Sequence, residues 1–125
     1  MAPLIGGQNV KATVLVEFAE GMHGYQNPPL KDYQLPVKLS STTLGIKIFP
    51  TYPKGVVKKL AGDEAAVYEG RTKIPVTIVL PKRAQKTKLV IRVDYQQCDD
   101  SACLPPNFAT ITSPLNIVTL KRRVR

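Results

Sequence analysis

The sequence is poor in several residue types, and each shortage narrows what the protein can be. It has no tryptophan, one histidine, two cysteines and nine acidic residues, against 18 lysines and arginines. It contains no run of about 18 apolar residues, so we expect no membrane-spanning helix. Its start, MAPLIGG, lacks the basic and apolar regions of a secretory signal. These absences favour either a cytosolic protein or a mature fragment.

The length and the hydrophobic content indicate one folded domain. The chain has 125 residues, close to the range of about 100–150 that is typical of single domains. Its 43% of hydrophobic residues is enough for an ordinary core. We predict a single domain over residues 1–125, with a flexible start at residues 1–8 and a basic tail at residues 121–125.

The scarcity of aromatic residues bears on the net charge of +9. Four basic residues lie in the tail, and five more surround one turn: Lys82, Arg83, Lys86, Lys88 and Arg92. Nucleic-acid-binding domains combine such charges with stacking aromatics or a recognition helix, and neither is visible here. We therefore expect no nucleic-acid partner. The simplest interpretation is a solvated basic surface, and the alternative is attraction to an anionic membrane.

Hydrophobic residues recur with period two along most of the chain, which is typical of strands with one buried face. The runs with this pattern cover residues 10–18, 44–48, 74–80, 89–95 and 108–120. The last run indicates one or two strands with a break near Pro114, and Pro36 and Pro75 indicate edges, strand starts or bulges. Only residues 57–68 allow a short helical turn. We predict an all-β fold, an immunoglobulin-like antiparallel β-sandwich.

The two cysteines, Cys98 and Cys103, lie five positions apart in a short polar turn between a strand and a Pro-Pro pair. Across such a turn their Cα atoms can approach the roughly 5.5–6 Å of a disulfide. A structural disulfide and a redox-active disulfide both fit this spacing. A metal site is poorly supported, because zinc takes about four ligands and the chain adds only the distant His23.

Three aspartates, Asp94, Asp99 and Asp100, are the only charged residues between Arg92 and Cys103. Nearby carboxylates raise the pKa of a thiol because they disfavour the thiolate. Such a pair would react poorly by itself and would suit a carrier that reacts only with a docked partner. The alternative is that the aspartates shape the turn through hydrogen bonds to its backbone.

The residues around the cysteines read Tyr-Gln-Gln-Cys98, four loop residues, then Cys103-Leu-Pro-Pro. This segment resembles the active-site segment of the N-terminal periplasmic domain of the thiol:disulfide interchange protein DsbD. Weaker similarities follow in the family's order at residues 21–25, 49–56 and 67–78. The similarity extends from Gly21 to Pro106, although the best-known members have one more residue between the cysteines.

The resemblance implies an immunoglobulin-like periplasmic domain that acts as a protein-disulfide reductase module through Cys98 and Cys103. It implies a thioredoxin-like domain as electron donor and periplasmic disulfide isomerases or cytochrome c maturation proteins as acceptors. It also implies that the native protein continues into a membrane domain. The redox-active disulfide stands in place of a cofactor. We expect Cys103 to form the mixed disulfide with clients and Cys98 to resolve it.

Further residues are expected beside the cysteines. Four lie next to them in the sequence: Tyr95, Asp99, Asp100 and Pro105. His23 and Tyr25 fall where the family places aromatic residues at the site, and ordinary strand packing or surface exposure is the alternative. His23, if protonated, would favour the thiolate.

A cap loop that shields the cysteines in the family corresponds to five residues here: Lys58, Lys59, Leu60, Ala61 and Gly62. If Leu60 covers the disulfide, the shield is apolar; if a lysine points inward, it lowers the pKa of the thiol. Whether Asp63 and Glu64 supply the family's acidic residues stays open.

The competing hypothesis is a non-enzymatic immunoglobulin-like binding module, whose disulfide fixes a recognition loop. The two hypotheses predict different reduction potentials. A structural disulfide lies below about −300 mV, and that of a carrier lies higher.

Overall fold

The computed structural model describes residues 3–119, and its regular elements are strands. They are β1 (Leu4–Ile5), β2 (Asn9–Glu17), β3 (His23–Tyr25), β4 (Lys38–Ser41), β5 (Lys47–Pro50), β6 (Val56–Leu60), β7 (Asp63–Glu69), β8 (Arg71–Val79), β9 (Gln85–Tyr95) and β10 (Asn107–Val118). No helix able to cross a membrane is found within residues 3–119.

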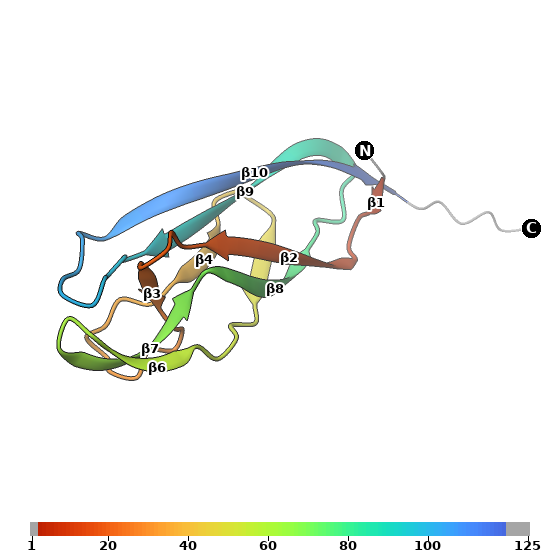
Figure 1. The fold of residues 1–125 in the computed structure, drawn as a ribbon. Helices are drawn as coiled ribbons and strands as arrows, with labels where there is room; N and C mark the ends of the chain where they lie inside the picture. Colours follow the sequence, from red (N-terminus) through yellow and green to blue (C-terminus); the bar gives the residue numbers. More distant parts are fainter. Residues whose placement is uncertain (1–2, 120–125) are drawn as a thin grey trace, which may run out of the picture.

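Two sheets form a sandwich, and a small third sheet lies at one end of it (Figure 1). The first sheet has the strand order β1-β10-β9-β4, the second β2-β8-β5 and the third β3-β7-β6. The short β1 pairs in parallel with β10, and the other strand pairs are antiparallel. The predicted all-β antiparallel sandwich is confirmed.

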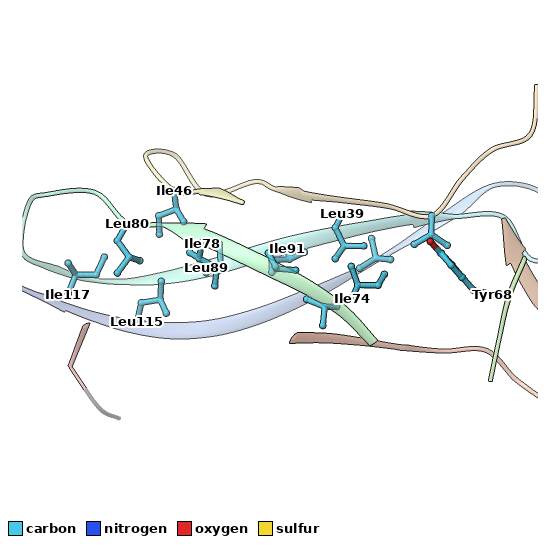
Figure 2. Close-up of a cluster of buried hydrophobic side chains, with 14 of the residues drawn as sticks. Leu39, Ile46, Tyr68, Ile74, Ile78, Leu80, Leu89, Ile91, Leu115 and Ile117 are labelled. Carbon is cyan, nitrogen blue, oxygen red and sulfur yellow. The ribbon is translucent and has the colours of Figure 1, made fainter. Parts of the chain in front are cut away.

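The core lies between the two large sheets (Figure 2). It is formed by the hydrophobic side chains that recur with period two and point to the inner face of each sheet. Buried aliphatic residues line the inner faces of two facing strands: Ile74, Val76 and Ile78 in β8 and Leu89, Ile91 and Val93 in β9. Each such side chain stabilises the fold by about 1.5–3 kcal/mol relative to exposure. A second, smaller cluster of buried residues joins the third sheet to the loop between β9 and β10: Tyr25, Leu60, Ala65, Val67 and Cys98.

Residues 57–68, the one stretch whose sequence allows a short helical turn, contain no helix. These residues form the β6–β7 hairpin, with Leu60 paired to Asp63 across a two-residue turn. Ala61 and Gly62 at the turn have φ values of 53° and 80°. Two positive φ values give a turn whose twist matches that of the flanking strands, and this favours a hairpin over a helix.

Within the start that was expected to be flexible, Leu4 and Ile5 pair with Ile117 and Val118 of β10. The expected basic tail at residues 121–125 lies outside the described residues. The expected break near Pro114 does not occur, because β10 pairs with β9 on both sides of it. Since β1 covers only the end of β10, the outer edge at Pro114 requires no backbone donor.

The two other prolines differ in how well they fit the expectation. Pro36 lies just before β4, as expected for a strand start. Pro75 lies within β8, the central strand of its sheet, opposite Thr13 of β2. The carbonyl of Pro75 accepts a hydrogen bond from the backbone N–H of Thr51 at 2.8 Å, one residue past the β5 ladder. The missing N–H therefore falls where the regular pairing with β5 has ended.

Candidate active site

The two cysteines form a disulfide in the loop that joins β9 to β10, at the left end of the molecule in Figure 1. They face each other in an isolated antiparallel bridge, with their Cα atoms 3.9 Å apart. The loop closes tightly, because the N–H of Asp99 donates to the carbonyl of Ala102 at 2.9 Å. This direct facing brings the Cα atoms closer than the separation expected from the sequence.

The aspartates of this segment are engaged with other groups than the sulfurs. The carboxylate of Asp99 accepts the backbone N–H groups of Ala102 at 2.7 Å and Ser101 at 2.8 Å, and these bonds lower the pKa of Asp99. Asp94 accepts a hydrogen bond from Nε of Arg92 at 2.9 Å. Asp100 is exposed. Of the two interpretations of these aspartates, the hydrogen bonds of Asp99 fit the one in which an aspartate shapes the turn by accepting hydrogen bonds from its backbone.

The two sulfurs differ in accessibility. Cys98 is 0% exposed and belongs to the small cluster of the third sheet, whereas Cys103 is exposed. An attacking group from solvent therefore meets Cys103 and not Cys98. Leu104, the next residue, is also exposed, and its N–H donates to the carbonyl of Gln97 at 2.8 Å.

His23 in β3 fixes the position of Cys98. The two residues exchange backbone hydrogen bonds of 2.9 Å in both directions. The buried imidazole lies with Nε2 3.0 Å from Oε2 of Glu69 and Nδ1 3.4 Å from the carbonyl of Cys98. Lys58 donates to the same Glu69 oxygen at 2.8 Å, and this bond, followed by that from His23, lowers the pKa of Glu69.

Tyr25 places its hydroxyl close to both sulfurs. Its hydroxyl lies 3.5 Å from Sγ of Cys103 and 3.6 Å from Sγ of Cys98. Burial raises the pKa of Tyr25, and the negative charge of Asp63 raises it further. The hydroxyl is therefore protonated at neutral pH and serves as a hydrogen-bond donor to sulfur.

The β6–β7 hairpin covers the buried side of the disulfide. Leu60 is 1% exposed and packs in one cluster with Tyr25 and Cys98. At the hairpin tip, the N–H of Ala61 donates to the carbonyl of Asp100 at 3.1 Å. Of the lysines, Lys58 bonds Glu69 and Lys59 is exposed. The side chain of this hairpin tip that packs with Cys98 is therefore the apolar Leu60.

A polar tether holds the hairpin tip to the segment before β4. The carboxylate of Asp63 accepts hydrogen bonds from the side chains of Lys31 and Tyr33, and from Nε2 of Gln34 at 3.3 Å. The bonds from Lys31 and then Tyr33 lower the pKa of Asp63 to about 2. Gln34 also donates to the carbonyl of Glu64 at 3.0 Å. Asp63 thus acts as an anchor of the hairpin, while its charge still reaches Tyr25.

Two of the residues expected near the cysteines lie beside the site and not against the sulfurs. Tyr95 packs against the main core and pairs with Asn107 of β10. Pro105 is exposed and lines a shallow hollow together with Tyr95, Gln97 and Leu104. The lining of this hollow begins at Leu104, the residue after Cys103.

Sequence reasoning missed four polar residues that hold the site together: Lys31, Tyr33, Gln34 and Glu69. The last of these faces His23 only because β3 pairs with β7, and a three-residue strand leaves no periodic signal. The other three lie in an irregular segment. Within residues 3–119, no cluster of three metal-ligating side chains is found.

The fold and the site together define a small β-sandwich domain that presents a local, half-exposed disulfide at one end. The family model described as "Thiol:disulfide interchange protein DsbD, N-terminal" matches residues 2–114. The chain therefore belongs to this family, whose members are modules for thiol:disulfide interchange.

A solved structure supports the fold assignment. The chain is similar to the N-terminal periplasmic domain of ScsB from Proteus mirabilis, with a TM-score of 0.67 and 15% sequence identity. The similarity covers 91% of this chain and 43% of that one, so this chain spans less than half the length of its structural relative. No curated protein matches the sequence.

Proposed function

We propose that this domain is a periplasmic electron carrier that accepts electrons from a thioredoxin-like partner and reduces disulfides of client proteins. The observation that carries the proposal is the asymmetry of one bond, in which Cys98 is fully buried and Cys103 is exposed. A disulfide between residues five positions apart closes too short a loop to stabilise the fold strongly. The location of the disulfide in a loop and the exposure of one of its two sulfurs fit a role in thiol–disulfide exchange better than a role in stabilising the fold.

The exchange step follows from this asymmetry. A thiolate of the partner attacks Sγ of Cys103, the S–S bond breaks, and Sγ of Cys98 leaves as a thiolate that takes up a proton. The second thiol of the partner loses its proton and attacks the mixed disulfide. Cys103 is released and protonated, and the partner becomes oxidised. Two electrons and two protons have then moved from the partner to the domain.

Tyr25 assists the departure of Cys98. Its hydroxyl lies 3.6 Å from Sγ of Cys98 and donates a hydrogen bond to the thiolate that forms there. Because its pKa is raised, the hydroxyl keeps its proton and does not add a competing negative charge. A hydrogen bond to a charged group is worth about 1.5–3 kcal/mol, and this one strengthens as charge develops on the sulfur.

The reduced domain then acts in the opposite direction, with the thiolate of Cys103 attacking an oxidised client. The proposed acceptors are periplasmic disulfide isomerases and cytochrome c maturation proteins, and family membership supports them. Leu104 and Pro105 lie exposed beside Cys103 and give a partner an apolar rim to contact. In this proposal the domain is the periplasmic part of a longer, membrane-bound reductase.

The deciding experiment is a redox titration of the folded domain. Equilibration with glutathione buffers, and separately with a thioredoxin-like protein, is expected to give a reduction potential above about −300 mV. A disulfide that stays oxidised in both would contradict the carrier and favour the binding module.

A trapping experiment then separates the two cysteines. Cys98→Ser leaves the exposed Cys103 thiol and is expected to trap mixed disulfides with oxidised partner, whereas Cys103→Ser leaves a buried thiol and traps few. Equal trapping by both variants would contradict the assigned roles.

A further inference from the structure

The charged residues of the domain are segregated along its long axis. All nine acidic residues and all five ion pairs of the described chain lie in the half that carries the disulfide. That half holds eight lysines and arginines as well, so its charges nearly cancel. In the opposite half, every charged residue within residues 3–119 is a lysine or an arginine.

We call this opposite end the basic pole and define it by six residues: Lys11, Lys47, Lys82, Arg83, Lys86 and Lys88. The register places them at one end of the sandwich, on both sheets, since Lys11 pairs with Thr77 and Lys47 with Val79, and β8 then turns into β9 through residues 80–84. All six are exposed, and none forms an ion pair with a described residue.

The β4–β5 turn adds an apolar side chain to the pole. Leu44 is 98% exposed and precedes Gly45, whose φ of 81° allows the tight turn. The turn is fixed to the pole, because the hydroxyl of Thr43 donates to the carbonyl of Lys88 at 2.9 Å and accepts the N–H of Val90 at 2.9 Å. A leucine held in solvent beside lysines has the chemistry of an interfacial anchor.

We propose that the basic pole docks on a membrane surface of anionic phospholipids, with Leu44 entering the headgroup region. Clustered lysines and arginines are attracted to acidic headgroups, and each contributes about a fivefold gain in partitioning. An aliphatic side chain such as that of Leu44 can contact lipid acyl chains, whereas proteins that bind single-stranded nucleic acids use aromatic side chains to stack on the bases. The charge pattern therefore favours a lipid surface over a nucleic acid.

Docking in this way orients the domain. Strand β1 and the end of β10 lie at the same end of the sandwich as the β8–β9 connection, and the disulfide loop lies at the other end (Figure 1). The 11 residues of β9 run from Gln85 at the pole to Tyr95 near the site, a rise of roughly 3.3 Å per residue and about 33 Å in all. Cys103 then faces away from the bilayer, where soluble partners reach it. The inference does not depend on the redox proposal.

Vesicle co-sedimentation of the 125-residue chain tests the inference. Vesicles of phosphatidylcholine with 30% phosphatidylglycerol are expected to bind the protein at 0.1 M salt and to release it at 0.5 M, since screening shortens the range of the attraction. Vesicles of pure phosphatidylcholine are expected to bind far less. Equal binding to both vesicles, or binding of a DNA duplex without binding of anionic vesicles, would overturn it.

Matched triple variants locate the site. Lys82→Gln with Arg83→Gln and Lys86→Gln is expected to lower partitioning about 100-fold, at fivefold for each charge. The control combines Lys38→Gln, Lys54→Gln and Lys73→Gln, which remove equal charge from exposed positions of the other half. It is expected to change partitioning less than fivefold. Equal losses in both would show that net charge alone acts and would contradict a docking face.

Single variants test the anchor. Leu44→Ser is expected to lower partitioning roughly tenfold through the loss of buried apolar area. Leu30→Ser, on another exposed leucine, is the control and is expected to have no effect. An unchanged Leu44→Ser would remove Leu44 from the docking face.

Discussion

The main core and the small cluster around Cys98 are built in different ways. The main core packs long strands against each other, and ladders such as β2–β8 and β9–β10 pair nine or more residues each. The small cluster has five buried residues, and side-chain bonds of Asp63 and Glu69 close it from outside. Regions with few buried apolar contacts open most readily. The comparison indicates that stability resides in the main core and control of reactivity in the small cluster.

The largest expected effect tests whether the main core supplies most of the stability of the fold. Ile74→Ala removes a fully buried side chain from the main core and is expected to lower the free energy of unfolding by about 2–5 kcal/mol. Urea denaturation of the oxidised protein measures it. The exchange rate of the folded variant is expected to stay unchanged. Leu15→Ala, on the exposed face of β2, is the control and should shift stability by less than about 0.5 kcal/mol.

The second prediction concerns a change in the small cluster, which is expected to affect the reactivity of the thiol more than the stability of the fold. Leu60→Ala thins the apolar shield over Cys98 and is expected to destabilise the protein less than Ile74→Ala, because the small cluster opens locally. Alkylation of the reduced protein at the Cys98 thiol is expected to become several-fold faster. Val57→Ala, an exposed residue of the same strand, is the control. If alkylation is no faster than in the control, Leu60 is not the shield.

The same contrast explains how much of the fold the sequence predicts. In the main core, β8 buries every second residue from Thr72 to Ile78, and β9 does so from Leu89 to Val93, so the period of these strands is readable. The β6–β7 hairpin was harder, because β7 buries four residues in a row, from Ala65 to Tyr68, and hides the period. Gly62 is of a residue type that favours turns, but the positive φ of the preceding Ala61 is not signalled by its residue type.

The site was predictable only where its residues are local or part of a motif. The spacing of Cys98 and Cys103 and the Asp99 turn are written into one short segment. The resemblance drew attention to Tyr25, whose contact with both sulfurs joins residues more than 70 positions apart. The Lys31–Asp63 contact depends on the course of an irregular segment, and no periodicity encodes that course.

The third prediction concerns chemistry within the small cluster. Tyr25→Phe removes the hydroxyl near both sulfurs and keeps the packing of the ring. Reduction of the disulfide by a thioredoxin-like protein is expected to slow about tenfold, the loss of one hydrogen bond to a charged sulfur. Tyr95→Phe is the control, since Tyr95 packs on the main core. An equal effect of both changes would assign Tyr25 a packing role only.

The smallest effect concerns the tether of the hairpin tip. The pKa of Asp63 is lowered to about 2 in the folded protein, so its bonds to Lys31 and Tyr33 favour the closed hairpin above the ordinary carboxyl pKa. This contribution is lost as the pH falls from about 4 towards 2. Asp63→Asn is expected to raise the rate of disulfide reduction by a water-soluble phosphine two- to threefold at pH 5. The ratio of the two rates should fall as the pH passes through about 2 and approach one below it, where wild-type Asp63 becomes protonated as well. A ratio that does not depend on pH would show that the ionised carboxylate does not hold the hairpin, and closure would then rest on Leu60 and the backbone bond of Ala61 to Asp100.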